Sequence, residues 1–217
     1  MQAHNPPQDR QARRHSQGLG WPRPWALALV CGNAVSLAAP PAGPSFDCAA
    51  VADGSVAQMV CDDPALAALD REMAAAYKQA RKRAARQHSP ALKAEQRGWI
   101  KGRDECRTGA DPRLCVEQAY RQRTAELQAK YRLVASRGPF NFACEGDPSN
   151  KVVVTFYTTD PPTLIAEHGD AVSLMFQQPS GSGARYAGRN ESFWEHQGEA
   201  MAVWGAGATE VRCKILR

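Results

Sequence analysis

A short loop rich in glycine and serine carries the side chains best suited to contact another molecule. The loop Ser180–Tyr186 reads Ser-Gly-Ser-Gly-Ala-Arg-Tyr, and the aromatic segment Phe193–Ala200 begins six residues after it. Such a loop buries little apolar area of its own, so a rigid scaffold has to present it to a partner. Ser182 offers a hydroxyl that can donate or accept a hydrogen bond, and His196 offers an imidazole. These residue types indicate recognition through hydrogen bonds and charge.

Residues of the kind that enzymes use as nucleophiles or bases are few. Beyond residue 38 the histidines are His88, His168 and His196, and the sequence contains neither a nucleophile-elbow motif nor a phosphate-binding loop. Glu195 and Glu199 could be imagined as a glycosidase dyad, but across a hairpin they are expected to be surface charge. We therefore predict a protein that is not an enzyme and needs no cofactor.

The N-terminal segment has the composition of an export signal. A polar stretch with four arginines precedes an apolar run at 25–35, and Ser36-Leu-Ala38 places small residues where a signal peptidase reads. Because the run is about half the length that spans a bilayer, we expect residues 1–38 to be a signal peptide and the protein to be periplasmic or secreted. The leader is long, so a start codon further downstream is the alternative. Cys31 suggests a lipoprotein, but 28–30 lacks the small residue expected just before the cysteine, so lipid anchoring is not predicted.

Six cysteines remain after residue 38. An even number in an exported chain indicates disulfides. Several pairings are possible, and the spacing favours neighbours: Cys48–Cys61, Cys106–Cys115 and Cys144–Cys213. Zinc is the competing use, but no C-x-x-C occurs and no histidine lies at ligand spacing from a cysteine pair, so no metal is expected.

The first half of the chain is predicted to be a small all-α unit of three helices. Each start is marked by a capping residue followed by proline, at 62–64, 89–90 and 111–112. Apolar residues three or four apart, as in Leu66, Leu69 and Met73, indicate a buried stripe. Because the core of so short a unit is modest, two of the disulfides are expected to clip it.

Charge is distributed unevenly along the chain, which carries a net charge of +5. Residues 39–138 carry +5 and residues 139–217 carry −3 by count. The basic residues of 78–86 share one helix face, and such a face is usually only solvated, so no nucleic-acid partner is expected.

After Cys144 the hydrophobic period changes from helical to two. Lys151–Tyr157 reads as a strand, and two hairpins are predicted around the turns at 168–170 and 197–198. Short strands joined by turns indicate a small antiparallel β-barrel or sheet. A Cys144–Cys213 bridge would close nearly all of it in one loop, the case in which a disulfide restricts the unfolded chain most. The predicted fold is therefore two domains, a disulfide-clipped three-helix unit followed by a small antiparallel β-barrel.

Residues 45–134 resemble the LprI-like family of exported bacterial domains. The resemblance rests on Phe46-Asp-Cys48, on Cys61–Asp70 with its C-x-D-P-x-L-x-x-L-D pattern, and on Gln96-Arg-Gly-Trp-Ile-Lys-Gly-Arg-Asp104 with Cys106. That family is linked to lysozyme inhibition, and the resemblance assigns no site residue in this half.

Residues 139–217 resemble the MliC family, the membrane-bound inhibitors of c-type lysozyme. The resemblance rests on Ser182-Gly-Ala-Arg-Tyr186, on Phe193-Trp194 and on Glu199-Ala200, bracketed by Cys144 and Cys213. The family pattern is S-G-A-R-Y, a short spacer and F-W-x-K-G-x-E-A on a small antiparallel β-barrel.

The resemblance implies that the Ser180–Tyr186 loop blocks the active-site cleft of lysozyme. In the family the serine hydroxyl and the lysine engage the two catalytic carboxylates; here Ser182 holds the serine position, and Arg185 and Tyr186 match as supports. His196 replaces the lysine, and an imidazole is only partly charged near neutrality. Arg189 in the spacer could supply the cation instead.

The function that these expectations favour is inhibition of c-type lysozyme by insertion of the Ser180–Tyr186 loop, which would protect bacterial peptidoglycan. The negative charge of 139–217 would attract a cationic lysozyme. The alternative is a non-enzymatic binding module of the cell envelope, whose basic helical half contacts anionic wall or membrane polymers.

Overall fold

The computed structural model describes residues 43–86 and 91–216. The expected signal peptide at 1–38, with Cys31, lies outside the described residues, and so do His88 and the predicted helix start at Ser89-Pro90. Within the described ranges, no helix has both the length and the apolar character needed to cross a membrane.

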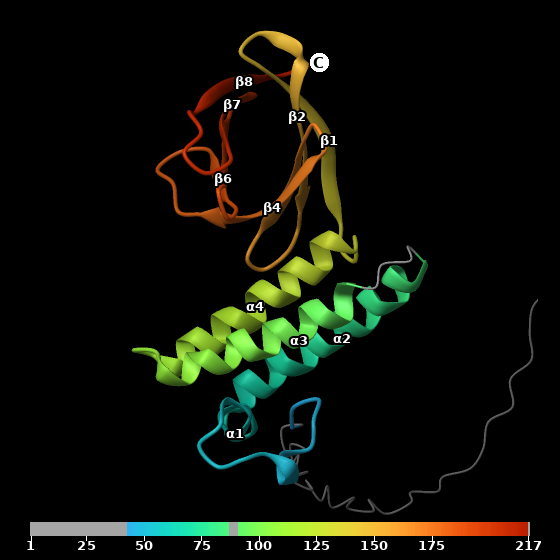
Figure 1. Ribbon diagram of the computed structural model, residues 1–217, viewed down its shortest axis with the longest axis vertical. Coiled ribbons are helices and arrows are strands. Elements are labelled where there is room, and N and C mark those ends of the chain that lie inside the picture. Colours follow the sequence, from blue (N-terminus) through green and yellow to red (C-terminus); the bar gives the residue numbers. More distant parts are fainter. Residues whose placement is uncertain (1–42, 87–90, 217) are drawn as a thin grey trace, which may run out of the picture. The chain divides into compact units, whose positions relative to one another are not determined.

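Three long helices dominate the first half of the chain (Figure 1). They are α2 (Pro64–Arg86), α3 (Ala91–Asp104) and α4 (Pro112–Lys130). The all-α unit is therefore confirmed, with the addition of a short helix α1 (Val56–Asp62) that was not predicted. Its seven residues make only about two turns, too few for a helical period to be evident in the sequence.

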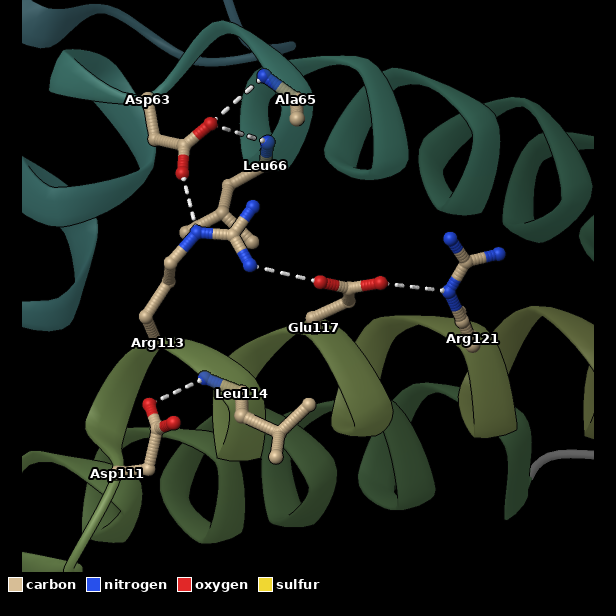
Figure 2. A network of polar contacts seen from close by, with 8 residues as sticks. All are labelled: Asp63, Ala65, Leu66, Asp111, Arg113, Leu114, Glu117 and Arg121. Atoms are coloured by element: carbon tan, nitrogen blue, oxygen red, sulfur yellow. Dashed lines mark hydrogen bonds and ion pairs between the residues drawn. The ribbon is translucent and has the colours of Figure 1, made fainter.

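Acidic side chains cap α2 and α4 at the predicted starts. The Asp63 carboxylate accepts hydrogen bonds from the main-chain N–H groups of Ala65 and Leu66, at 2.8 and 3.2 Å. Figure 2 shows that it also accepts one from Arg113 Nε of α4. The distance between these two atoms is 2.8 Å. Asp111 caps α4 in the same way. One carboxylate thus satisfies the free N–H groups of α2 and ties that helix to α4.

The core of the helical unit combines the predicted apolar stripe with a buried polar network. Leu66 and Met73 of the predicted stripe are buried. The Tyr120 hydroxyl is also buried; it donates to Asp70 Oδ1 at 3.0 Å and accepts from Arg103 Nη1 at 2.8 Å. Burial raises the pKa of this hydroxyl above its usual range, so Tyr120 stays protonated. The network satisfies polar groups that would otherwise be costly to bury.

Two disulfides join short 3₁₀ segments of the helical unit to its helices. Cys48, in the 3₁₀ segment η1 (Cys48–Ala50), is bonded to Cys61 of α1, and Cys106, in η2 (Glu105–Thr108), is bonded to Cys115 of α4. These are pairings between neighbours in the sequence, as the spacing favours.

Eight antiparallel strands follow and close into a barrel (Figure 1). In chain order they are β1 (Ser136–Cys144), β2 (Asp147–Tyr157), β3 (Thr163–His168), β4 (Ala171–Gln178), β5 (Ala184–Ala187), β6 (Glu191–His196), β7 (Glu199–Trp204) and β8 (Val211–Ile215). Each strand pairs with the next, and β1 pairs with β8 to complete the closure. The Cys144–Cys213 disulfide joins β1 and β8 at directly paired residues. The barrel prediction is confirmed.

The predicted hairpins form, but strand β1 was not predicted. β3 and β4 pair around the turn at 169–170, and β6 and β7 pair around Gln197-Gly198. Residues 136–139 contain glycine and proline and read as the end of the helical half. They become a strand because β1 pairs with both β2 and β8, a long-range effect that no local period reports.

Side chains alternate between the barrel interior and its outer surface. Val152, Val154 and Phe193 are buried inside. Trp194 is 40% exposed, since it follows Phe193 and so points outward. Glu195 faces inward again and lines an interior cavity, instead of lying on the surface as expected.

Candidate functional site

The loop between β4 and β5, residues 179–183, lies at the same end of the barrel as the turn between β6 and β7. Ala184, the first residue of β5, pairs with Glu195 near the end of β6. His196 then pairs with Glu199 across the turn. The register therefore brings the end of the loop beside His196.

Gly183 allows the loop to close against the end of β6. Its φ of 64° lies in the left-handed region that glycine adopts without strain. A β-carbon at this position would collide with the main-chain oxygen of Glu195 and would lie 3.0 Å from the His196 Cβ atom. The Ser180 hydroxyl donates to the Gly183 carbonyl at 3.0 Å and tightens the loop from the other side. A larger residue than glycine would push the loop away from His196.

Trp194 holds the loop at Ser182. Its indole Nε1–H donates a hydrogen bond to the Ser182 carbonyl at 2.9 Å. The Ser182 main chain is thereby fixed, while its side chain remains exposed and makes no hydrogen bond to a described residue. The serine hydroxyl is available to a partner.

A shallow hollow on the outer surface collects these groups. Its volume is ≈ 290 Å³, and it is lined by Ser182, Trp194, His196, Glu199, Ala200, Met201 and Arg212. The structure thus brings together Ser182 and His196, which are 14 positions apart in the sequence.

One row of outward-facing side chains runs across four strands beside the hollow. Arg185 of β5 pairs with Trp194 of β6, which pairs with Met201 of β7, which pairs with Arg212 of β8. Sequence reasoning missed Trp194 and Arg212 as site residues. The period of two would have placed Trp194 on the surface, because Phe193 points inward, and Arg212 likewise precedes the buried Cys213.

Two of the predicted site residues lie away from the hollow. Tyr186 is buried in the barrel, with its ring centroid 5.6 Å from that of Phe156, and its side chain does not line the hollow. Arg189 is in the turn between β5 and β6, at the opposite end of β5 from Ser182. The four residues of β5 separate them by about 13 Å along the strand. Arg189 therefore does not share the hollow with Ser182.

His196 occupies the corner of a tight turn. Gln197 and Gly198 both have positive φ, at 54° and 83°, as a two-residue hairpin turn requires. Gln197 stands where the resembling family has glycine, and it adopts the backbone conformation that glycine favours. The turn is thus formed despite the substitution, and the exposed His196 keeps its place at the end of β6.

Two basic side chains of β8, Arg212 and Lys214, lie close to Glu199 at the hollow. Lys214 Nζ lies 3.0 Å from Glu199 Oε1, and this hydrogen bond, with the charges of Lys214 and Arg212, lowers the pKa of Glu199. Arg212 is exposed and forms no ion pair with any described residue. Its guanidinium is the cation at the hollow that remains available to a partner's carboxylate.

The basic face of the helical half is formed by exposed side chains of α2. The side chains of Lys78, Arg81, Lys82, Arg83 and Arg86 are exposed, as the solvated reading expects. No group of three or more histidine, cysteine, aspartate or glutamate side chains within the described ranges could hold a metal ion.

Both halves of the chain match families of known proteins. Residues 142–210 match the family described as membrane-bound lysozyme-inhibitor of c-type lysozyme, MliC, and residues 48–127 match the family described as lysozyme inhibitor LprI. The protein named lipoprotein LprI in Mycobacterium bovis and in Mycobacterium tuberculosis is 37% identical over 161 residues, which are 74% of this chain and 79% of that protein. No solved structure matches the chain.

The chain consists of a helical unit with two disulfides, followed by a closed eight-stranded barrel. Each of these parts matches a family of lysozyme inhibitors, so the protein is of the lysozyme-inhibitor class. The chain belongs to the LprI family.

Proposed function

We propose that this protein inhibits c-type lysozyme by inserting the Ser180–Tyr186 loop into the active-site cleft, and so protects bacterial peptidoglycan. The observation that carries the proposal is that Ser182 and His196 line one hollow, with the loop held by a hydrogen bond from Trp194. Both family descriptions that match the chain name lysozyme inhibitors, and an inhibitor of this kind performs no catalysis of its own.

The chemistry of the target explains why a hydroxyl and a cation are suitable. A glycosidase of this type keeps one carboxylic acid protonated and one carboxylate ionised. The Ser182 hydroxyl can accept a hydrogen bond from the acid or donate one to the carboxylate. A cation placed against the ionised carboxylate would add a charge-assisted hydrogen bond.

Arg212 is the residue we assign to the ionised carboxylate. It lines the same hollow as Ser182, it is exposed, and it is not engaged by any described carboxylate within ion-pair distance. The nearby Lys214 is less suited, because Glu199 already pairs with it at 3.0 Å. Arginine offers a planar fork that fits a carboxylate with two hydrogen bonds. His196 would then shape the loop and add charge when protonated.

We place this action outside the cytoplasm. Residues 1–38 have the composition of an export signal. Three disulfides are present, and disulfides persist mainly in oxidising compartments. The relatives are named lipoproteins, so lipid attachment at Cys31 and cleavage after Ala38 are the two alternatives. The mass of the mature protein distinguishes them.

The test is a titration of c-type lysozyme with the purified protein, followed by the rate of peptidoglycan lysis. We expect inhibition, and we expect Ser182→Ala to raise the inhibition constant roughly 10-fold or more, because hydrogen bonds to charged groups contribute about 1.5–3 kcal/mol. The matched control is Ser149→Ala, since Ser149 is exposed at the start of β2 and its hydroxyl, among the described residues, bonds only Asp147. Unchanged lysis in a large molar excess of the protein would rule out the function. Equal effects of the two substitutions would rule out the loop.

A further inference from the structure

An interior cavity of the barrel is separate from the lysozyme-binding hollow. Its volume is ≈ 710 Å³, within the range of roughly 300–1,000 Å³ that is typical of small-molecule sites. All its lining residues belong to the barrel strands and the segments between them, and none of them lines the hollow at Ser182. The cavity therefore needs an explanation of its own.

Aromatic rings form a large part of the cavity wall. Phe140 and Phe142 of β1, Phe156 of β2 and Tyr186 of β5 all line it. The Phe156 ring lies 6.0 Å from Phe140 and 5.6 Å from Tyr186, measured between centroids. Rings grouped in this way provide apolar area and also attract cations to their faces.

Glu195 is the single carboxylate of the lining. Its Oε1 atom accepts a hydrogen bond from the Gly198 N–H at 2.9 Å, and its Oε2 atom accepts none from the described residues. Burial, and to a smaller extent the negative charge of Glu195, raises the pKa of Tyr186. A partly buried carboxylate with one free oxygen among aromatic rings is suited to pair with a cation.

We propose that the barrel cavity binds a small organic cation, an ammonium group carried on an apolar body. The ammonium would pair with Glu195, and the apolar body would pack against the rings of Phe140, Phe156 and Tyr186. Arg137, the one basic residue of the lining, is exposed at the start of β1, where water screens its charge. An anionic ligand would instead place its charge beside Glu195, so the cavity should reject it.

The test compares three ligands that share one apolar body: octylammonium, octanol and octanoate. Isothermal titration calorimetry of the purified protein, below the micelle concentrations, should show octylammonium binding at least tenfold more tightly than octanol, and octanoate most weakly. Glu195→Gln retains the shape of the side chain and an oxygen for Gly198. It should lower the affinity for octylammonium about tenfold and leave octanol binding unchanged. Glu167→Gln, at an exposed position of β3, is the matched control and should change neither.

A second variant tests the same charge pattern from the opposite side. Arg137→Ala removes the positive charge of the lining and, because water screens that charge, should change octylammonium binding much less than Glu195→Gln does. The proposal is overturned if none of the three ligands binds, if all three bind equally, or if Glu195→Gln leaves the ratio of octylammonium to octanol affinity unchanged. Far-UV circular dichroism of each variant establishes that the barrel is folded, so that a loss of binding reports on the cavity.

Discussion

The indole Nε1–H of Trp194 donates a hydrogen bond to the main-chain carbonyl of Ser182, at 2.9 Å. The bond links an outward-facing residue in the middle of a strand to a loop that contains no buried side chain. It uses the carbonyl of Ser182 and leaves the hydroxyl exposed. The loop is therefore positioned by a residue of the rigid barrel, and the ordering of the loop is largely complete before a partner binds.

Trp194→Phe tests this positioning. The phenyl ring retains most of the apolar area of the side chain but donates no hydrogen bond. Losing a bond of this kind costs about 1 kcal/mol, so the inhibition constant for c-type lysozyme should rise roughly fivefold. Because Phe193 and not Trp194 fills the core, the midpoint of thermal unfolding should change little.

The matched control for Trp194→Phe is Val172→Ala. Val172 is 67% exposed near the start of β4, at the other end of the barrel from the Ser182 loop. This substitution also trims an exposed apolar side chain, and it should leave inhibition unchanged. If Trp194→Phe inhibits as well as the unaltered protein, the hydrogen bond does not position the loop for binding.

Arg212 and Arg189 provide a direct comparison of two candidate cations. Both are exposed arginines of the barrel, but only Arg212 lines the hollow with Ser182. We expect Arg212→Ala to raise the inhibition constant roughly 10-fold or more, in line with the loss of a charged hydrogen bond, and Arg189→Ala to change it less than twofold.

Arg212→Lys sharpens this comparison in lysozyme inhibition assays. Lysine keeps the positive charge but loses the planar fork, so it should restore only part of the inhibition lost in Arg212→Ala. The assignment of the cation to Arg212 is wrong if Arg189→Ala has the larger effect. In that case the spacer loop contacts the lysozyme.

The elements of the fold were predictable wherever a local signal marks them. The capping side chains of Asp63 and Asp111 indicate helix starts, and Gln197-Gly198 indicates a hairpin turn. β1 was not predictable, because its strand character comes from pairing with β2 and β8. Helix starts and hairpin turns are determined by nearby residues, whereas strand β1 depends on closure of the whole barrel.

The candidate site was only partly predictable for a similar reason. Ser182 and His196 stand out through their spacing, and the structure places them in one hollow. Arg212 is 30 positions beyond Ser182 and belongs to no recognisable motif. It reaches the hollow only through the register of β7 with β8. Glu195 was wrongly expected on the surface for a similar reason. Its side chain points inward because side chains alternate along β6 and Phe193, two residues earlier, is buried.

Asp63 should make the stability of the helical unit depend on pH. Burial alone would raise its pKa, but the N–H groups of Leu66 and Ala65, together with Arg113, outweigh burial and lower it. Because the pKa in the folded state is the lower one, this stabilisation is present above the ordinary aspartate pKa of about 3.9 and is lost as the pH falls through the folded value. Arg113 and Arg121 likewise hold the pKa of Glu117 down (Figure 2).

Asp63→Asn separates the charge of this side chain from its capping role. Asparagine still caps a helix, so the substitution should lower the free energy of unfolding at pH 7, and the difference should shrink toward pH 3. Asp63→Ala should cost about 1 kcal/mol more than Asp63→Asn, because the cap is lost as well. Denaturant unfolding followed by the circular dichroism of the helices measures both. The exposed Asp53, changed to Asn, is the control, and a constant difference between pH 7 and pH 3 would contradict the assignment.

The Cys144–Cys213 disulfide should contribute more to stability than Cys106–Cys115. The first closes a chain segment with a sequence separation of 69 and the second one of 9. From the entropy of loop closure, the bonds restrict the unfolded chain by about 4 and about 2.5 kcal/mol respectively. Replacing both cysteines of a pair by alanine, and measuring denaturant unfolding of the barrel and of the helices, gives the two values.

Lysozyme inhibition should depend on the stability of the barrel. Without Cys144–Cys213 it should be lost at a lower denaturant concentration, and removal of Cys106–Cys115 should leave it unaffected. A larger loss of inhibition on removing Cys106–Cys115 would mean that the helical half takes part in the contact.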